Sequence, residues 1–146
     1  SGRTNVLHWN VSDKFSATVR ARSDASAPQF FFPIRFFASG DNHILLGFDS
    51  SINTASYILR TISASTASTN VLPVERDNNW HDFTISVHGS GRVRARVDCD
   101  PTPFVENASR VPTVDMYFNS GIQNREAVNR QMDIDSVILI PSLVLF

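Results

Sequence analysis

Short runs in which apolar and polar residues alternate recur along the chain and predict β-strands separated by turns. The clearest early example is FSATVRAR, residues 15–22, in which every second residue is apolar. Side chains alternate between the two faces of a strand, so one face of this run is buried and the other is solvated. Further strands are predicted at residues 30–38, 43–48, 56–62, 80–88, 92–98, 114–118 and 134–139, with a last candidate at 143–146.

The strongest local signal is a hairpin at residues 80–98. Two alternating runs flank the tight turn Gly89-Ser90-Gly91, and a three-residue loop with glycine is typical of a β-hairpin. By contrast, the small polar residues 63–70 show no stripe of either period and predict a loop. Residues 123–131 form the only candidate helix, but they lack an apolar stripe and are interpreted as a turn or loop.

Three consecutive phenylalanines, Phe30 to Phe32, open the second predicted strand. Neighbouring residues of a strand face opposite sides, so at least one ring is exposed unless both faces of the sheet are covered. Pro33 follows them. A proline inside a strand indicates an edge strand or a bulge, because it cannot donate a ladder hydrogen bond.

About nine or ten short strands, with no internal repeat and no linker-like segment, fit one domain over residues 1–146. The predicted fold class is all-β, a two-sheet antiparallel β-sandwich of the jelly-roll, concanavalin-like type. A chain of 146 residues buries enough surface for a full core without metal or disulfide staples.

The charge and composition of the chain exclude some classes of function. The net charge is −1, which supplies no field for nucleic acid, and no apolar run approaches the ~20 residues that insert in a membrane. Cys99 is the single cysteine, so a disulfide could form only between chains. The chain opens with Ser-Gly rather than Met, as a trimmed fragment or a mature product would, so a signal sequence could have been removed. We expect an extracellular, secreted protein.

Two resemblances agree with the predicted fold. The segment NWHDFTISV, residues 79–87, followed by RVRARVD, residues 92–98, resembles the paired strands of laminin-G-like, concanavalin-type sandwiches, and residues 132–139 resemble their final strand. Over residues 31–121, the order of IRFFASGDNHILL, YILR, PFVE and VDMYFNSG is similar to the farnesoic acid O-methyltransferase-like domain of invertebrate proteins. This second resemblance implies a domain that has no methyl-donor site and is joined to extracellular or lectin-like proteins.

The first candidate binding surface is a row of arginines. Alternation places Arg92, Arg94 and Arg96 on the same side of one strand, roughly 6.8 Å apart, and Arg20 and Arg22 repeat the pattern. Like charges in a row are unfavourable unless anions oppose them. The row is therefore either paired with acids on the neighbouring strand or bound to an acidic glycan, since arginine grips carboxylate and sulfate with two hydrogen bonds.

The second candidate surface combines planar polar groups with an aromatic ring, as sugar binding requires. Asp41, Asn42 and His43 lie at a turn, and Asn79, Trp80 and His81 lie at the start of a strand. The alternative is that Trp80 is a core residue and its neighbours only form a turn. A second group of this kind consists of His8, Trp9 and Asn10.

Other chemistry has weaker support. The pairs Asp98/Asp100 and Asp133/Asp135 are the only calcium candidates, and the four histidines lack zinc spacing. No hydrolase carboxylate pattern, nucleophile elbow or phosphate-binding glycine loop occurs, so no catalytic residue is assigned. Two glycosylation sequons begin at Asn10 and Asn107.

These observations predict a non-catalytic module of a secreted or surface protein that recognises a glycan or glycoprotein. We expect no organic cofactor, and calcium is the one candidate metal. The alternative is a structural sandwich domain that self-assembles or engages protein partners in a coat, filament or receptor ectodomain. Oligomer mass separates the two, and a homo-oligomer would favour assembly.

Overall fold

The computed structural model describes residues 8–24, 29–88, 91–99, 102–124 and 130–141. A short 3-10 helix, η1 (Val11–Asp13), precedes ten strands. The strands are β1 (Phe15–Ser23), β2 (Gln29–Ser39), β3 (Asn42–Asp49), β4 (Ser56–Ser63), β5 (Thr66–Glu75), β6 (His81–His88), β7 (Arg92–Val97), β8 (Val105–Asn107), β9 (Tyr117–Asn124) and β10 (Met132–Ile140).

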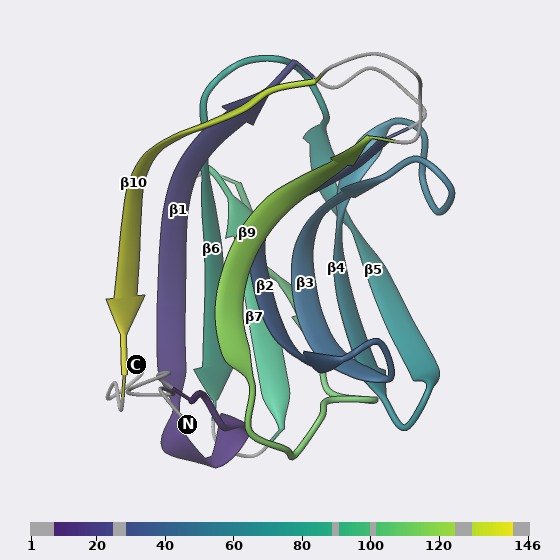
Figure 1. The fold of residues 1–146 in the computed structure, drawn as a ribbon, viewed down its shortest axis with the longest axis vertical. Helices are drawn as coiled ribbons and strands as arrows, with labels where there is room; N and C mark the ends of the chain where they lie inside the picture. Colours follow the sequence, from purple (N-terminus) through teal and green to yellow (C-terminus); the bar gives the residue numbers. More distant parts are fainter. Residues whose placement is uncertain (1–7, 25–28, 89–90, 100–101, 125–129, 142–146) are drawn as a thin grey trace, which may run out of the picture.

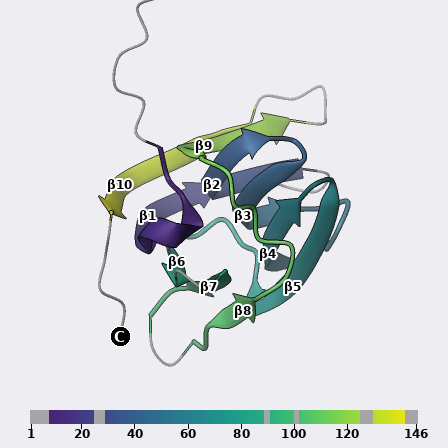
Figure 2. The same cartoon turned by 90° about the horizontal axis from the view of Figure 1, so that it is seen from below.

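The strands form two antiparallel sheets that pack face to face (Figure 1; Figure 2). The β1 sheet has the order β10-β1-β6-β7-β8, and the β2 sheet has the order β5-β4-β3-β2-β9. The predicted all-β, two-sheet antiparallel sandwich is therefore confirmed. Among the described residues, no helix is long and apolar enough to cross a membrane.

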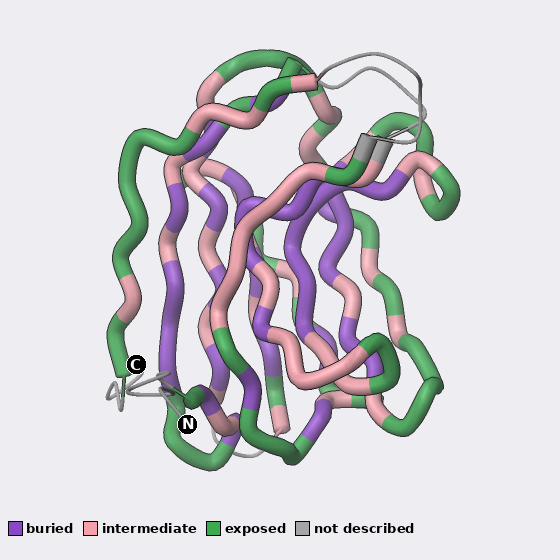
Figure 3. Tube along the Cα trace, viewed as in Figure 1, coloured by how far each residue is buried: buried purple, intermediate pink, exposed green. Residues whose placement is uncertain are grey.

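The core lies between the two sheets, where the inward residues of the alternating strands meet (Figure 3). Aromatic rings join the layers: Phe83 of β6 packs edge-on against Phe31 at 5.8 Å and against Tyr57 at 5.1 Å. Trp9 closes one end, 3% exposed, with its ring 5.1 Å from that of Phe15. The suggestion of a sugar site at Trp9 is thus wrong, because the ring is core.

Phe30, Phe31 and Phe32 divide between the two faces of β2, as alternation predicts. Phe31 enters the main core, whereas Phe32 belongs to a smaller apolar cluster on the outer face of the β2 sheet, with Leu45, Ile58 and the partly buried Phe30. Phe32 is only 8% exposed, so this outer face has a shallow apolar layer of its own.

Pro33 lies at a bulge in β2. The pairing of β2 with β3 skips from Phe31 opposite Phe48 to Ile34 opposite Leu46, so Gly47 faces two residues. The bulge prediction is confirmed, but the edge alternative is wrong, because β2 lies inside its sheet between β3 and β9. The bulge leaves the proline out of the regular hydrogen-bond ladder.

Residues 63–70 are not a loop. The chain turns at Ala64 and Ser65, whose φ angles are 49° and 66°, and then pairs back as β5. β5 is an edge strand with mostly exposed side chains, so it needs few apolar residues and left no alternating signal. Residues 123 and 124 complete β9, while residues 125–129 and the strand candidate at 143–146 lie outside the described residues.

A buried polar network joins β8 to the β2 sheet. The Asn107 side chain, 2% exposed, donates hydrogen bonds from Nδ2 to Thr61 Oγ1 at 3.1 Å and to the Ser68 carbonyl at 3.1 Å. Its Oδ1 accepts a hydrogen bond from Asn70 Nδ2. Buried amides must be paired in this way, so the second sequon asparagine is a structural residue of the folded chain.

Candidate functional site

The predicted arginine row occupies the outer face of the β1 sheet, and its members are partly neutralised within the chain. Arg94 Nε donates to Glu106 Oε2 at 2.7 Å, and Arg20 Nη1 lies 3.3 Å from Asp82 Oδ1. Arg96 stacks over the Phe104 ring at 4.3 Å, while Arg92 is exposed. The hydrogen bond from Arg94 is the main cause that lowers the pKa of Glu106. Of the two predicted alternatives, the geometry shows internal pairing for Arg94 and Arg20.

The turn residues Asp41 and Asn42 connect two loops. The Asp41 carbonyl accepts from the Ser65 amide at 3.1 Å, and Asn42 Oδ1 accepts from the Ala64 amide at 3.2 Å. The next residue, His43, is half-buried on the outer face of the β2 sheet. These three residues therefore lie on the other sheet from the arginine row, and the two predicted groups do not form one site.

His81 is a buried charge centre with little access for a ligand. Its side chain is 9% exposed, Nδ1 lies 2.8 Å from Asp98 Oδ2, and Nε2 lies 2.8 Å from Asp77 Oδ1. Burial favours the neutral ring, but the hydrogen bonds to Asp98 and Asp77 outweigh it and raise the pKa of His81 above its usual value. With carboxylates at both nitrogens, the imidazole is held as a donor on each side.

Trp80 is not a core residue, although its sequence position allowed that interpretation. It is partly exposed at the start of β6, and the guanidinium of Arg22 lies 4.8 Å from the centre of its ring. The Arg20 guanidinium is 5.8 Å from the same ring. The preceding Asn79 is exposed, with its amide bound to Asp77 Oδ1 at 2.8 Å. An aromatic ring and arginines from β1 thus share one corner of the β1 sheet.

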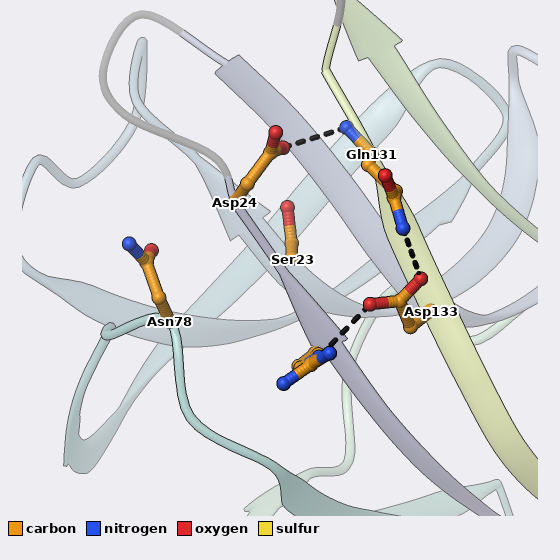
Figure 4. Close-up of a pocket in the computed structure, with 6 residues that line it drawn as sticks. Ser23, Asp24, Asn78, Gln131 and Asp133 are labelled. Carbon is orange, nitrogen blue, oxygen red and sulfur yellow. Dashed lines mark hydrogen bonds and ion pairs between the residues drawn. The ribbon is translucent and has the colours of Figure 1, made fainter.

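A polar cavity of about 300 Å³ lies next to this corner (Figure 4). Its walls come from the end of β1, from the β5–β6 connection and from the start of β10. The lining residues are Arg22, Ser23, Asp24, Asn78, Gln131 and Asp133. Arg22 belongs both to the cavity wall and to the stack on Trp80, so it connects the cavity to an aromatic ring that is not itself among the lining residues.

Hydrogen bonds fix one wall of the cavity. Arg22 Nε donates to Asp133 Oδ2 at 2.9 Å, Gln131 Nε2 donates to Asp133 Oδ1 at 2.5 Å, and the Gln131 amide donates to Asp24 Oδ1 at 2.6 Å. The bonds from Gln131 and then Arg22 lower the pKa of Asp133, which keeps it ionised. Asn78 lies across from this wall (Figure 4).

Several hydrogen-bonding groups of the cavity are available to a ligand. Within the described part of the chain, the terminal nitrogens of Arg22, the second carboxylate oxygen of Asp24 and Nδ2 of Asn78 have no hydrogen-bond partner. They offer donors and an acceptor in fixed orientations. A ligand with several hydroxyl groups needs both kinds, because each hydroxyl donates one hydrogen bond and accepts others.

The sequence did not identify Asp24, Gln131 or Ser23 as candidate binding residues, and no motif or pattern in it marks them. Arg22 and Asp133 are 111 positions apart and meet only because β1 pairs with β10. The calcium candidates Asp98 and Asp133 bind His81 and Arg22, respectively, and Asp100 lies outside the described residues. Among the described residues, no cluster of three metal-ligating side chains occurs. Calcium binding stays a prediction.

No family model and no curated protein matches the chain. Solved structures do match. A functionally unknown protein from Saccharomyces cerevisiae is 15% identical, with 94% of this chain and 75% of that one covered and a TM-score of 0.65. The binding domain of botulinum neurotoxin serotype D/C is 9% identical, with coverage of 90% and 32% and a TM-score of 0.52.

Another matching structure is of botulinum neurotoxin type C, whose cell entry depends on interaction with two ganglioside molecules. It is 12% identical, with 94% of this chain and 34% of that chain covered and a TM-score of 0.57. The chain thus spans about a third of the toxin chains that it matches. At these identities the likeness shows the shared β-sandwich fold, and two of these three neighbours are binding proteins.

Proposed function

We propose that the protein is a non-catalytic binding module of a secreted or surface protein, and that it recognises a glycan or glycoprotein at the cavity beside Trp80. One observation carries the proposal: polar side chains from three distant segments meet around a hollow, and one of them, Arg22, stacks on the ring of Trp80. This is the combination that sugar recognition uses, and the presence of binding domains among the structural neighbours supports it.

The cavity dimensions suit a small saccharide unit. A volume of about 300 Å³ lies at the lower end of the range for ligand pockets, so one sugar ring fits while the rest of the glycan stays in solvent. Asp24 accepts from hydroxyl groups, and Arg22 and Asn78 donate to them. The ring of Trp80, which stacks on the cavity residue Arg22, supplies apolar contact area for the C–H face of a neighbouring sugar.

A glycan array tests this proposal, with the purified chain probed with and without calcium. Trp80→Ala should weaken the array hits by about 2- to 12-fold, the range expected for one lost aromatic contact. Asn78→Ala, which removes one cavity donor, should weaken them by a similar factor. Lys14→Gln removes an exposed charge elsewhere and serves as the control. A blank array at high protein concentration would refute glycan recognition.

Self-assembly is the second candidate function, and the edge strand β10 favours it. β10 lies at the edge of the β1 sheet and exposes four large apolar side chains. They are Ile134, Val137, Ile138 and Ile140, with Ile138 54% exposed. An apolar edge is a template for pairing with another strand. Light scattering should then give a multiple of 16.3 kDa that Ile138→Lys reduces to the monomer mass; a monomeric wild type would exclude assembly.

A further inference from the structure

The outer face of the β2 sheet carries a second set of binding groups, far from the cavity in the fold. Arg35 of β2 and Arg60 of β4 both pair with Leu45 of β3, from its two sides, so they stand about 10 Å apart on one face. His43 lies two residues along β3, opposite Phe37. We call Arg35, His43 and Arg60 the cationic cluster.

Arg35 is held in a fixed plane by aromatic rings. Its guanidinium lies 4.3 Å from the ring centre of Phe32 and 4.3 Å from that of Phe37. Nε donates to Asn119 Oδ1 on β9 at 2.8 Å. In the described part of the chain, the two terminal nitrogens have no partner. The rings and Asn119 therefore preorganise the edge of the guanidinium that grips a carboxylate with two parallel hydrogen bonds.

Further contacts support this arrangement. The Phe37 ring packs on His43 at 5.8 Å and on the exposed Tyr117 at 5.7 Å. Phe32 lies over Gly121, where an added Cβ would come within 2.6 Å of the ring. Glycine at this position thus leaves room for the Phe32 ring that contacts Arg35. A guanidinium that is stacked and hydrogen-bonded loses little further freedom when a ligand binds.

Within the described strands of this sheet, no acid lies in register with the cationic cluster, and Asp41 lies in the turn before His43. The only acids in the five strands of this sheet are Asp49, which is in register with Phe30 at the far end of β3, and Glu75, which is in register with Ser56. Burial, followed by Arg35 and Arg60, lowers the pKa of His43. Burial also lowers the pKa of Arg35. An anion bound here would relieve this repulsion.

We propose that this face binds the carboxylate of an acidic sugar, such as a hexuronate, with the terminal nitrogens of Arg35 as the main contact. Asn119 Nδ2 and the Tyr117 hydroxyl are positioned to bind ring hydroxyls, and the exposed Tyr117 ring offers a platform for the sugar. The choice of a sugar rests on the proposed function, whereas the choice of an anion rests on the cluster itself. The cavity beside Trp80 belongs to the other sheet, so the two sites are separate.

The test is an NMR titration of the ¹⁵N-labelled chain with sodium glucuronate, glucose and sodium acetate at constant ionic strength. Glucuronate should give saturable shifts at the amides of Arg35, His43 and Asn119, and glucose should give none there. Saturation with glucuronate should also raise the pKa of His43, because a bound carboxylate stabilises the imidazolium.

Two variants of Arg35 separate the contribution of its two-point hydrogen bonding from that of its positive charge. Arg35→Met should weaken glucuronate binding roughly tenfold or more, because a charge-assisted, two-point contact is lost. Arg35→Lys keeps the charge but loses the fork, so it should still bind several-fold more weakly than the wild type. Lys14→Gln removes a charge at a distance and should bind as the wild type does. Spectra of each free variant establish that it is folded.

Each outcome decides the proposal. Equal binding of glucose at these amides would overturn the carboxylate assignment, and equal affinity for acetate would overturn the sugar assignment and leave a simple anion site. The absence of shifts with all three ligands would overturn the site altogether. Array hits that Trp80→Ala removes, together with no glucuronate shifts at Arg35, His43 and Asn119, would uphold the proposed function while refuting this inference.

Discussion

Replacement of Asn107 by alanine should destabilise the fold substantially, although the residue contacts no candidate ligand. Asn107 makes three side-chain hydrogen bonds, two donated to Thr61 and Ser68 and one accepted from Asn70. Each buried hydrogen bond contributes about 1 kcal/mol net to stability. Two of the partners keep another bond, because Thr61 also donates to the Ser109 carbonyl and Asn70 also donates to the Glu106 carbonyl.

Since these partners are not fully orphaned, the loss should stay near the sum of three bonds plus a small void, about 2 to 4 kcal/mol. Unfolding entropy near 2.1 cal/mol/K per residue, applied to this chain, converts this to a fall in melting temperature of roughly 7 to 13 °C. A double-mutant cycle with Thr61→Val should show that the two changes are not additive, because they share one bond.

The assay is urea denaturation followed by tryptophan fluorescence, with calorimetry for the melting temperature. Asn78→Ala, which truncates an exposed amide, is the matched control and should change the free energy of unfolding by less than about 0.5 kcal/mol. If Asn107→Ala lowers the free energy of unfolding no more than this control does, the buried network does not hold β8 to the β2 sheet.

Three further predictions concern stability and modification. The pKa of His81 is raised and that of Asp77 is lowered, so both groups stabilise the folded state fully between about pH 3.8 and 6.5. The contribution of His81 is lost as pH rises through its folded-state pKa, and that of Asp77 is lost below about pH 3.8 as its carboxylate is protonated. The pKa of His43 is lowered, so its contribution to stability changes with pH in the opposite direction. The measurement is therefore the difference in unfolding free energy between the wild type and His81→Asn across this pH range. A difference that does not vary with pH would contradict the assignment. Gly47→Ala should cost about 1 to 3 kcal/mol, since an added Cβ would overlap the backbone at the bulge, whereas Gly40→Ala, with open space around it, should be nearly neutral in the same melts. Protein expressed in a host that glycosylates sequons should carry no glycan at Asn107, because this side chain is buried. A glycan found at Asn107 by peptide mapping of the folded protein would disprove the burial of this residue.

Much of the fold was predictable from alternation alone. The run at residues 15–22 and the hairpin at residues 80–98 became β1, β6 and β7, because each buries one face against the core. β5 was not predicted because it lies at the edge of a sheet, where side chains such as Thr66 and Ala67 remain exposed and no apolar period is required. Alternation reports burial, so it misses strands held mainly by backbone hydrogen bonds.

The candidate sites were less predictable, since they depend on which strands become neighbours. Arg35 and Asn119 are 84 positions apart and meet through the pairing of β2 with β9. The arginine row made Arg94 a predicted ligand-binding residue, but in the structure it pairs with Glu106. The sequence identified Trp80 and His43 as candidates, but it could not place them on opposite sheets. Local patterns specify faces, whereas the partners across a sheet follow from the global topology.

The position of β1 between β10 and β6 also determines the order in which the chain can fold. Hairpins such as β6–β7 can close soon after they leave the ribosome, but β1 must wait for residues 132–140 before its second edge is covered. At roughly 5 to 20 residues per second, this delay is about 6 to 23 s. Throughout that interval the nascent chain presents an unpaired strand edge, which is a template for pairing with other chains, and the many long-range contacts of the finished sandwich make the final step slow.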